Sequence, residues 1–372
     1  MPNMQYMQDQ EPKQRLGYMD GLRAIAVISV AISHFDRHTP DINPLKPSLF
    51  NAGIHGVDLF FVISGFCLAY PYLLNLRNSK MLNFCLPIFY AKRIVRILPP
   101  YYVAIVILSC IAVLPINSLF LGVGETTGLR TILNEFALTD YKGLFQNGSF
   151  WTLAIEFRWY LLFPLFLILY EKSSRYFYVL LIGILFYIPL TRASNVDMMF
   201  LPYFLSGIIA ADASITRPRW TKFSWIGFLI SMYLAITTQL PNPEGYFLGP
   251  FWGIASFCLV ICAGRYQLLQ RLLSLPGLKL VGIASYSIYL IHEPIIIFCI
   301  QALHFSRIPA VLTGVTGGIV YWYLVERIFL SNPLRGKMID SVYSCLERLN
   351  QGMQSNATPR TRASSQIDLL LE

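Results

Sequence analysis

An arginine and a histidine bracket the first long apolar segment of the chain. Arg23 precedes the run AIAVISVAIS, and His34 lies eleven residues further on, about 16 Å along an α-helix. That distance is roughly half the hydrocarbon thickness of a bilayer. An imidazole at this depth can act as a general base or a nucleophile, and a guanidinium binds anions. Both groups are costly inside a membrane, so the pair predicts a reaction path rather than a passive anchor.

Asp58 and Glu156 are the carboxylates that could orient the His34 imidazole. Asp58 opens the second apolar segment, GVDLFFVISGF, on the side where the first one ends. An acid in a first helical turn also stabilises the helix dipole by itself, so that role stays open. Glu156, in SFWTLAIEFRWY, has a predicted depth comparable with that of His34. We expect His34, Asp58 and Glu156 to be the catalytic residues.

The helix that carries Glu156 has other polar and aromatic side chains. Tyr160 shares the face of Glu156, and Trp151 lies about one turn earlier, so both are candidate substrate contacts. Arg158 is about 200° from Glu156 around the helix. The two charges therefore cannot face one cavity, and we expect Arg158 to pair with a neighbouring helix.

Arg93 and Arg96 precede two prolines in KRIVRILPP. At a spacing of three they share a helix face, and guanidinium forks suit phosphate groups. Together with Arg23 they predict a site for a polyanion on the cytoplasmic side. An ordinary cluster of cytoplasmic anchoring charges is the alternative.

A further polar group lies in YSIYLIHEP, where Tyr286 and His292 are candidate substrate contacts. Pro294 removes a backbone hydrogen bond, so we expect the helix to be interrupted at His292-Glu293-Pro294 beside a cavity, or to be kinked against its neighbours.

The composition predicts that these segments lie in a membrane. The chain is 55% hydrophobic and only 13% charged, against about 25% charged in soluble domains. The sequence therefore predicts an all-α integral membrane protein with a bundle of about ten transmembrane helices, the first of them retained rather than cleaved. The predicted spans cover residues 18–36, 56–74, 98–116, 150–170, 176–192, 199–213, 222–240, 246–264, 279–301 and 307–330.

The basic residues predict the orientation. With a cytoplasmic N-terminus, 22 of the 29 Lys and Arg residues fall on the cytoplasmic side and six on the other, a strong positive-inside bias. We expect a cytoplasmic tail at 1–15, a membrane domain at 16–335 and a cytoplasmic, partly disordered tail at 336–372. The glycine-rich segment 117–148 could form a lid or short helices over the outer opening.

The same patterns argue against other functions. The net charge of +9 is divided among short loops, which is untypical of nucleic-acid binding. The seven cysteines lack the spacing of metal ligands and are expected to be buried thiols, so we expect no metal. No internal repeat is visible, which weakens the case for an inverted-repeat transporter.

Taken in order, five motifs resemble the membrane acyltransferase-3 family, over residues 16 to 335. They are DGLRAIAV with its Arg-x10-His spacing, GVDLFFVISGF, KRIVRILPPYY, SFWTLAIEFRWY and ASYSIYLIHEP. Thr152 stands where the family often has serine, and threonine keeps the hydroxyl group. The family includes bacterial O-acetylases of O-antigen and exopolysaccharide. Many members carry a C-terminal SGNH-type domain, which we expect this chain to lack.

The resemblance implies transfer of an acyl group, typically acetyl, from cytoplasmic acetyl-CoA to a hydroxyl of a cell-surface or lipid-linked carbohydrate. The partners would be acyl-CoA, the carbohydrate and the lipid of a bacterial inner membrane. The three arginines would hold the coenzyme A phosphates. His34 would act as the general base or take the acyl group itself, and Asp58 or Glu156 would hold its tautomer.

Two other classes of function stay open. A proton-coupled transporter would use His34, Asp58 and Glu156 as a proton relay and would need no acyl-CoA. In a structural or sensory membrane protein the buried charges would only pair helices, and their substitution would change stability without removing a product.

Overall fold

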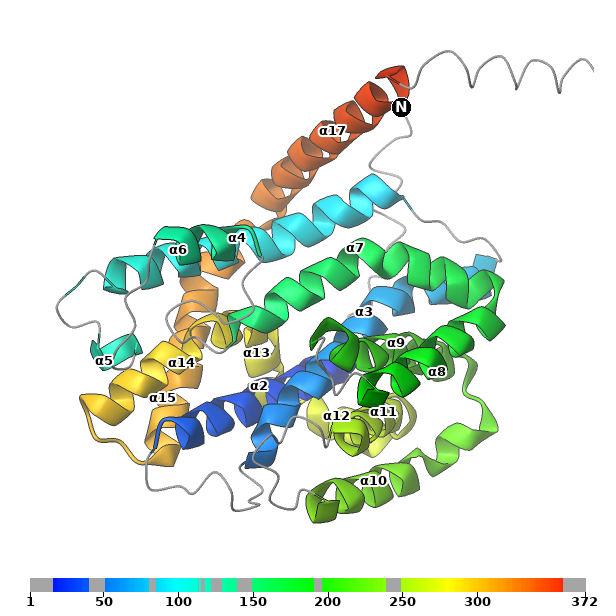
Figure 1. Ribbon diagram of the computed structural model, residues 1–372. Helices are drawn as coiled ribbons and strands as arrows, with labels where there is room; N and C mark the ends of the chain where they lie inside the picture. Colours follow the sequence, from blue (N-terminus) through cyan, green and yellow to red (C-terminus); the bar gives the residue numbers. More distant parts are fainter. Residues whose placement is uncertain are drawn as a thin grey trace, which may run out of the picture.

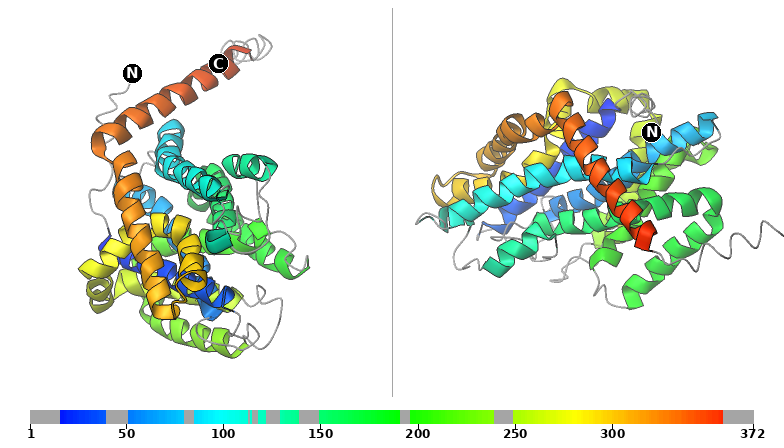
Figure 2. Two further views of the ribbon diagram at one scale, coloured as in Figure 1. Left: turned by 90° about the vertical axis from the view of Figure 1, so that its left-hand side faces the viewer. Right: turned by 90° about the horizontal axis from the view of Figure 1, so that it is seen from above.

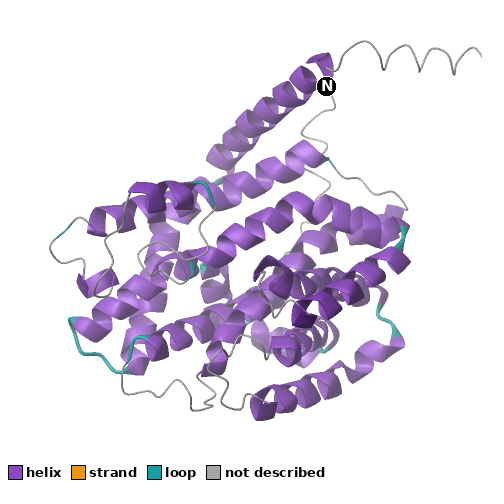
Figure 3. Ribbon diagram, in the orientation of Figure 1, coloured by secondary structure: helices purple, strands orange, loops and turns teal. Residues whose placement is uncertain are grey.

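A computed structural model describes residues 16–39, 51–79, 85–112, 114, 118–121, 129–138, 149–190, 196–238 and 249–356. Among these residues the regular structure is helical and contains no strand (Figure 3), which confirms the predicted all-α class. The predicted N-terminal tail, the end of the C-terminal tail from 357 and much of the 117–148 segment lie outside the described residues.

The helices pack into one bundle (Figure 1). Its first half contains α2 (Gly17–Arg37), the 3₁₀ turn η1 (Asn51–His55), α3 (Gly56–Ser79), α4 (Leu86–Ala112), α5 (Ser118–Leu121), α6 (Leu129–Phe136), α7 (Phe150–Lys172) and α8 (Ser174–Leu190). Its second half contains α9 (Val196–Thr216), the 3₁₀ turn η3 (Arg219–Phe223), α10 (Ser224–Thr238), α11 (Gly249–Arg265), α12 (Gln267–Leu273), α13 (Pro276–Ile283), α14 (Ser285–Gln301), α15 (Arg307–Tyr321), the π-turn η5 (Trp322–Glu326), α16 (Arg327–Phe329) and α17 (Asn332–Asn356).

Each predicted span contains a helix, but the structure does not confirm that ten helices cross a membrane. In the described part of the chain, five helices are long and apolar enough to cross a bilayer: α3, α4, α7, α9 and the run from α15 to α16. The count rises to seven if two bent pairs are single spans, α11 with α12 at 102° and α13 with α14 at 78°. The helices α8 and α10 have only 17 and 15 residues.

The helix α2 is not among the five, because charged and polar residues flank its short apolar run at both ends. This helix lies inside the bundle. It packs against α3, α12, α13, α14 and α15. Two glycines allow the closest approach. A Cβ on Gly282 would lie 1.7 Å from the backbone oxygen of Asp20, and one on Gly21 would lie 2.1 Å from that of Leu273. This packing fixes the first turns of α2 and thereby the position of Arg23.

The helices α3 and α9 make the most extensive helix pair through two facing glycines, at the small-residue site that Ser64-Gly65 predicts. A Cβ on Gly65 would lie 2.0 Å from the backbone oxygen of Phe204, and one on Gly207 would lie 2.2 Å from that of Val62. The backbones are therefore in direct contact beside Ser64.

Replacing Gly65 with a larger residue should separate α3 from α9. We expect Gly65→Val to destabilise the protein by roughly 3 kcal/mol, since the overlapping atoms belong to backbone that cannot rotate away. Thermal unfolding in detergent measures this loss. Gly183→Val in α8 is the matched control, because a Cβ there meets no atom within 4 Å. Equal unfolding temperatures for the two variants would contradict the packing argument.

Two expectations about local structure are corrected. The helix α14 runs through Pro294 without interruption, and the break lies earlier, at Ala284, between α13 and α14. Helix α4 begins at Leu86, well before the predicted span, so Arg93 and Arg96 lie within a long helix that continues through both prolines.

The chain leaves the bundle through a π-turn and a long polar helix. Helix α17 follows the π-turn η5 and the short helix α16, and it crosses α4 (Figure 2). It occupies the first part of the predicted C-terminal tail, which is therefore helical as far as Asn356.

Candidate active site

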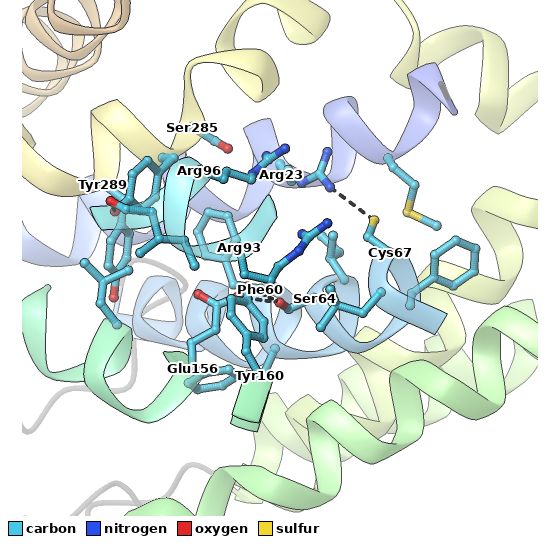
Figure 4. A pocket seen from close by; sticks show the side chains of 18 of the residues that line it. Arg23, Phe60, Ser64, Cys67, Arg93, Arg96, Glu156, Tyr160, Ser285 and Tyr289 are labelled. Atoms are coloured by element: carbon cyan, nitrogen blue, oxygen red, sulfur yellow. Dashed lines mark hydrogen bonds between the residues drawn. The ribbon is translucent and has the colours of Figure 1, made fainter. Parts of the chain in front are cut away.

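A cavity of about 430 Å³ opens between α2, α3, α4, α7, α14 and α17. Figure 4 shows its centre, where Arg23, Arg93 and Arg96 converge on one side and Glu156, Ser64 and Tyr160 lie on the other. The cavity extends along α3 from Val57 to Pro71, fourteen residues or about 21 Å of helix. Segments that are far apart in the sequence therefore form one elongated pocket.

The three predicted arginines line this cavity together. Arg23 donates to Asp20 at 2.8 Å and to the Cys67 sulfur at 3.1 Å, which fixes its guanidinium at the wall. Arg93 and Arg96 form no ion pair within the part of the chain that the structure describes, and the buried Nε of Arg93 has no hydrogen-bond partner there. Their donors are available to an anion.

Glu156 lies in the cavity wall and not beside His34. One carboxylate oxygen of Glu156 accepts hydrogen bonds from the Ser64 hydroxyl and the Tyr160 hydroxyl, and these two hydroxyls lie 2.9 Å apart. Glu156 is thus a fixed negative group facing the arginines. Tyr160 lines the cavity as predicted for a substrate contact.

His34 belongs to a second cluster, formed by the end of α2 and the middle of α14. The His34 side chain is buried, and its Nδ1 lies 3.1 Å from Oε2 of Glu293. The other oxygen of Glu293 lies 2.9 Å from His38 Nε2 and 3.7 Å from the Arg37 guanidinium. The contact has ion-pair distance but not hydrogen-bond geometry, since Nδ1 of His34 has no hydrogen-bond partner in the described part of the chain. A carboxylate this close to Nδ1 favours the tautomer with hydrogen on that nitrogen, which leaves Nε2 as the basic atom.

His292 stacks on His34. Their ring centroids are 4.9 Å apart and their planes are inclined by 21°. The Nδ1–H of His292 donates to the backbone oxygen of Ile288 at 2.8 Å, so the neutral ring has its lone pair on Nε2. His292 supports the His34 ring and is not one of the residues that line the cavity.

Tyr289 connects the cavity with the histidine cluster. It lines the cavity, and its ring centroid lies 6.1 Å from that of His292 and 5.7 Å from that of Phe60. The Thr152 hydroxyl donates to the Ser149 backbone oxygen, so the Tyr289 hydroxyl donates to Thr152 at 2.6 Å. Tyr289, Phe60 and Thr152 therefore form the cavity wall nearest the histidines.

Asp58 contacts a different histidine. Its carboxylate lies 2.8 Å from Nδ1 of His55, three residues earlier, and His55 stacks on Trp252 at 4.8 Å. We expected Asp58 to meet His34, but a local partner in the preceding turn holds it instead. The carboxylate that contacts His34 is Glu293.

This pair should be structural. We expect Asp58→Asn to lower the unfolding temperature, because a buried charge-assisted hydrogen bond is weakened. The catalytic rate per folded molecule should stay within about twofold of wild type, which quantification of folded protein by size-exclusion chromatography alongside an activity assay will show. A large loss of the catalytic rate at normal stability would show instead that Asp58 takes part in catalysis.

The other predicted residues separate into two groups. Tyr286 lines the cavity and donates its hydroxyl to the Ile97 backbone oxygen at 2.8 Å. Trp151 packs on Phe200 at 5.5 Å and is not a cavity residue. Arg158 pairs with Asp197 on α9 at 2.6 Å, as expected for a charge that holds two helices together.

Two residues of the site escaped sequence reasoning. Glu293 follows His292 and is a buried acid inside an apolar helix, which is itself a signal of function. We read the surrounding HEP as a helix break instead. Arg335 lines the cavity from α17, at the last residue of the expected membrane domain.

The site and the fold define a class before any relative is considered. A helical membrane bundle has here an arginine-rich cavity, and Tyr289 and His292 lie between that cavity and a histidine–carboxylate pair. This arrangement suits group transfer from an anionic carrier. The model of the family described as "Acyltransferase domain" matches residues 16–327. The chain belongs to this family.

Curated relatives are O-acetyltransferases by name. A peptidoglycan O-acetyltransferase, OatA, of Listeria monocytogenes is 27% identical over 363 residues, which cover 85% of this chain and 55% of that protein. The O-acetyltransferase OatA of Staphylococcus aureus is 26% identical over 373 residues, covering 86% of this chain and 57% of its own length. The chain thus spans little more than half the length of these relatives. No solved structure matches.

Proposed function

We propose that the chain is a membrane O-acyltransferase that moves an acetyl group from acetyl-CoA to a carbohydrate hydroxyl. The observation that carries this proposal is that Tyr289 lines the arginine cavity and lies against His292, whose ring stacks on His34 beside Glu293. His34 and Glu293 themselves are not among the residues that line the cavity. One end of the site suits a polyphosphate, and the other holds a general base or nucleophile. An acyl thioester of coenzyme A has the complementary polarity, with phosphates at one end and the reactive carbonyl at the other.

The cavity suits an extended donor. Its length of about 21 Å along α3 accommodates a pantetheine arm whose nucleotide end lies at Arg23, Arg93 and Arg96. Hydrogen-bonding groups such as Ser64 line the route and suit the amides of that arm. The thioester would reach the wall formed by Phe60, Thr152 and Tyr289.

At that wall His34 activates the acceptor. Its Nε2 takes the proton of the sugar hydroxyl while the sugar oxygen attacks the thioester carbonyl carbon. The carbon–sulfur bond breaks, and the imidazolium returns the proton to the thiolate. Alternatively Nε2 first takes the acetyl group and the sugar then displaces it. In both routes Glu293 is a positioning residue, because it fixes the His34 tautomer and stabilises its positive charge.

We also propose a class of acceptor and an orientation of the chain in the membrane. The Listeria relative is named for peptidoglycan, which supports a cell-envelope polysaccharide as acceptor. The predicted ten spans, with both termini cytoplasmic in a bacterial inner membrane, would place the arginines toward cytoplasmic acyl-CoA and His34 toward the outer glycan. The positive-inside bias supports this orientation.

The test measures acetate released by mild alkali from envelope polysaccharide. Cells with the gene, without it and with His34→Ala are compared at matched protein levels. Ester that appears only with the intact protein is the expected result, and the fraction that carries it identifies the acceptor. Equal ester in all three cultures would overturn the proposal.

A further inference from the structure

We propose that Arg335 of α17 is a fourth phosphate ligand of the donor, so that the C-terminal helix forms part of the acyl-CoA site. This inference rests on the proposed function and adds a residue beyond the segment 16–327 that the acyltransferase family matches. Arg335 lines the same cavity as Arg23, Arg93 and Arg96, and it comes from an element that no sequence motif assigned to the site.

The placement of Arg335 follows from the packing of α17 on α4. Ile339 is buried in a small apolar cluster with Ala91 and Val95 of α4, and Met338, Val342 and Tyr343 pack around it. Arg335 precedes Ile339 by one turn and shares its helix face. The face that binds α4 therefore also presents Arg335 to the cavity.

Helix α4, on which α17 packs, also carries apolar contact residues and cavity arginines side by side. Ala91 and Val95 on α4 alternate with Arg93 and Arg96, so one stretch of this helix both receives α17 and carries two cavity arginines. The two helices thus bring Arg93, Arg96 and Arg335 to a common pocket. The contact that holds α17 on α4 therefore also brings the arginines of the cationic site together.

The charge in the cavity points to an anionic ligand with more than one phosphate. The charged residues lining it are four arginines and a single carboxylate, Glu156, which already accepts two hydroxyl hydrogen bonds. In the described part of the chain Arg335 forms no ion pair. Arg23 is paired with Asp20, whereas Arg93 and Arg96 also form no ion pair in the described part of the chain. Unpaired guanidinium groups gathered in a partly enclosed site repel one another, and phosphate relieves that repulsion.

Coenzyme A offers two separate phosphate positions, the diphosphate and the 3′-phosphate. Arg93 and Arg96 lie on adjacent turns of one helix and suit a single group bidentately. Arg335 approaches from another helix, which suits contact with the nucleotide end at a second position. The thioester end of the donor has no such group, so the contribution of Arg335 should depend entirely on the phosphates.

The experiment measures calorimetric Kd values for coenzyme A, dephospho-coenzyme A and pantetheine with the full chain in nanodiscs. Wild type, Arg335→Gln, Arg335→Lys and the exposed control Lys337→Gln are compared. We expect Arg335→Gln to weaken coenzyme A binding about tenfold and to leave pantetheine binding unchanged, since a charge-assisted hydrogen bond is lost. Arg335→Lys should recover part of the affinity, and Lys337→Gln should match wild type.

Each outcome has a distinct meaning. If dephospho-coenzyme A binds Arg335→Gln and wild type equally, Arg335 acts on the 3′-phosphate, and if the tenfold loss persists it acts on the diphosphate. The inference would be overturned if the Arg335→Gln variant bound coenzyme A with the Kd of wild type. Equal losses of affinity for pantetheine and coenzyme A would overturn it as well. Wild-type protein that binds no coenzyme A would instead overturn the proposed donor, and the inference with it. Should Arg335→Gln fail to fold, Arg335→Lys decides, because a charge kept in place must retain phosphate-dependent binding.

Discussion

His34→Ala should reduce acetyl transfer by about 10³-fold while the protein keeps its fold, because the proposed general base or acyl acceptor is lost. The side chain is buried, and its Nδ1 lies 3.1 Å from a carboxylate oxygen of Glu293, so we assign the chemistry to Nε2. The measurement is the initial rate of ester formation by protein in nanodiscs, with acetyl-CoA as donor and the identified envelope glycan as acceptor.

The chain offers a matched control for this variant. His55 is also buried, stacks on an aromatic ring and lies 2.8 Å from a carboxylate, but its partners are Asp58 and Trp252 rather than Glu293 and His292. We expect His55→Ala to cost stability and to keep the rate per folded molecule. Equal rates for His34→Ala and wild type, or equal losses in both histidine variants, would refute the assigned role.

Glu293→Gln should lower kcat by about 10²-fold and leave KM for acetyl-CoA unchanged. The amide is nearly isosteric with the carboxylate, but it carries no charge to stabilise the His34 imidazolium and can present its NH₂ group to Nδ1 instead. Steady-state kinetics at varied acetyl-CoA separate the two constants. The arginine cavity that we propose as the donor site is unchanged in this variant, which is why affinity should be retained.

Asp36→Asn is the control for Glu293. Asp36 is a buried acid near the end of α2 that also carries His34. It pairs with Arg307 at 2.8 Å rather than with a histidine. Its substitution should affect stability alone. A wild-type kcat for Glu293→Gln, or an equal kcat loss in Asp36→Asn, would show that Glu293 does not position His34.

The residues that sequence reasoning found share a simple property. Arg23, His34 and Glu156 are polar groups in or at the edge of long apolar runs, so their energetic cost marks them without any knowledge of contacts. Arg93 and Arg96 precede a predicted span and are marked by their spacing on one helix face. The helical class follows from the same runs. The spacing of Arg93 and Arg96 also predicts correctly that they share a face, which the cavity confirms.

The residues that it missed depend on tertiary packing. Asp58 was expected beside His34 because two helix ends meet on one side, but His55 is its nearer partner in sequence and in space. Glu293 reaches His34 only because α14 stays helical through Pro294, which the proline pattern did not predict. Arg335 enters the site through the docking of α17 on α4, which no local pattern encodes.

The central claim, that the arginine cavity holds acyl-CoA, can be tested at Cys67, whose sulfur lies 3.1 Å from the Arg23 guanidinium inside the cavity. The measurement is the rate at which a small thiol reagent modifies Cys67, read by peptide mass spectrometry so that the other cysteines are resolved. Acetyl-CoA should slow this modification in wild type, and pantetheine at the same concentration should protect far less. Protection should weaken in Arg96→Gln. An unchanged rate at Cys67 in a sample that is turning over acetyl-CoA would contradict the account.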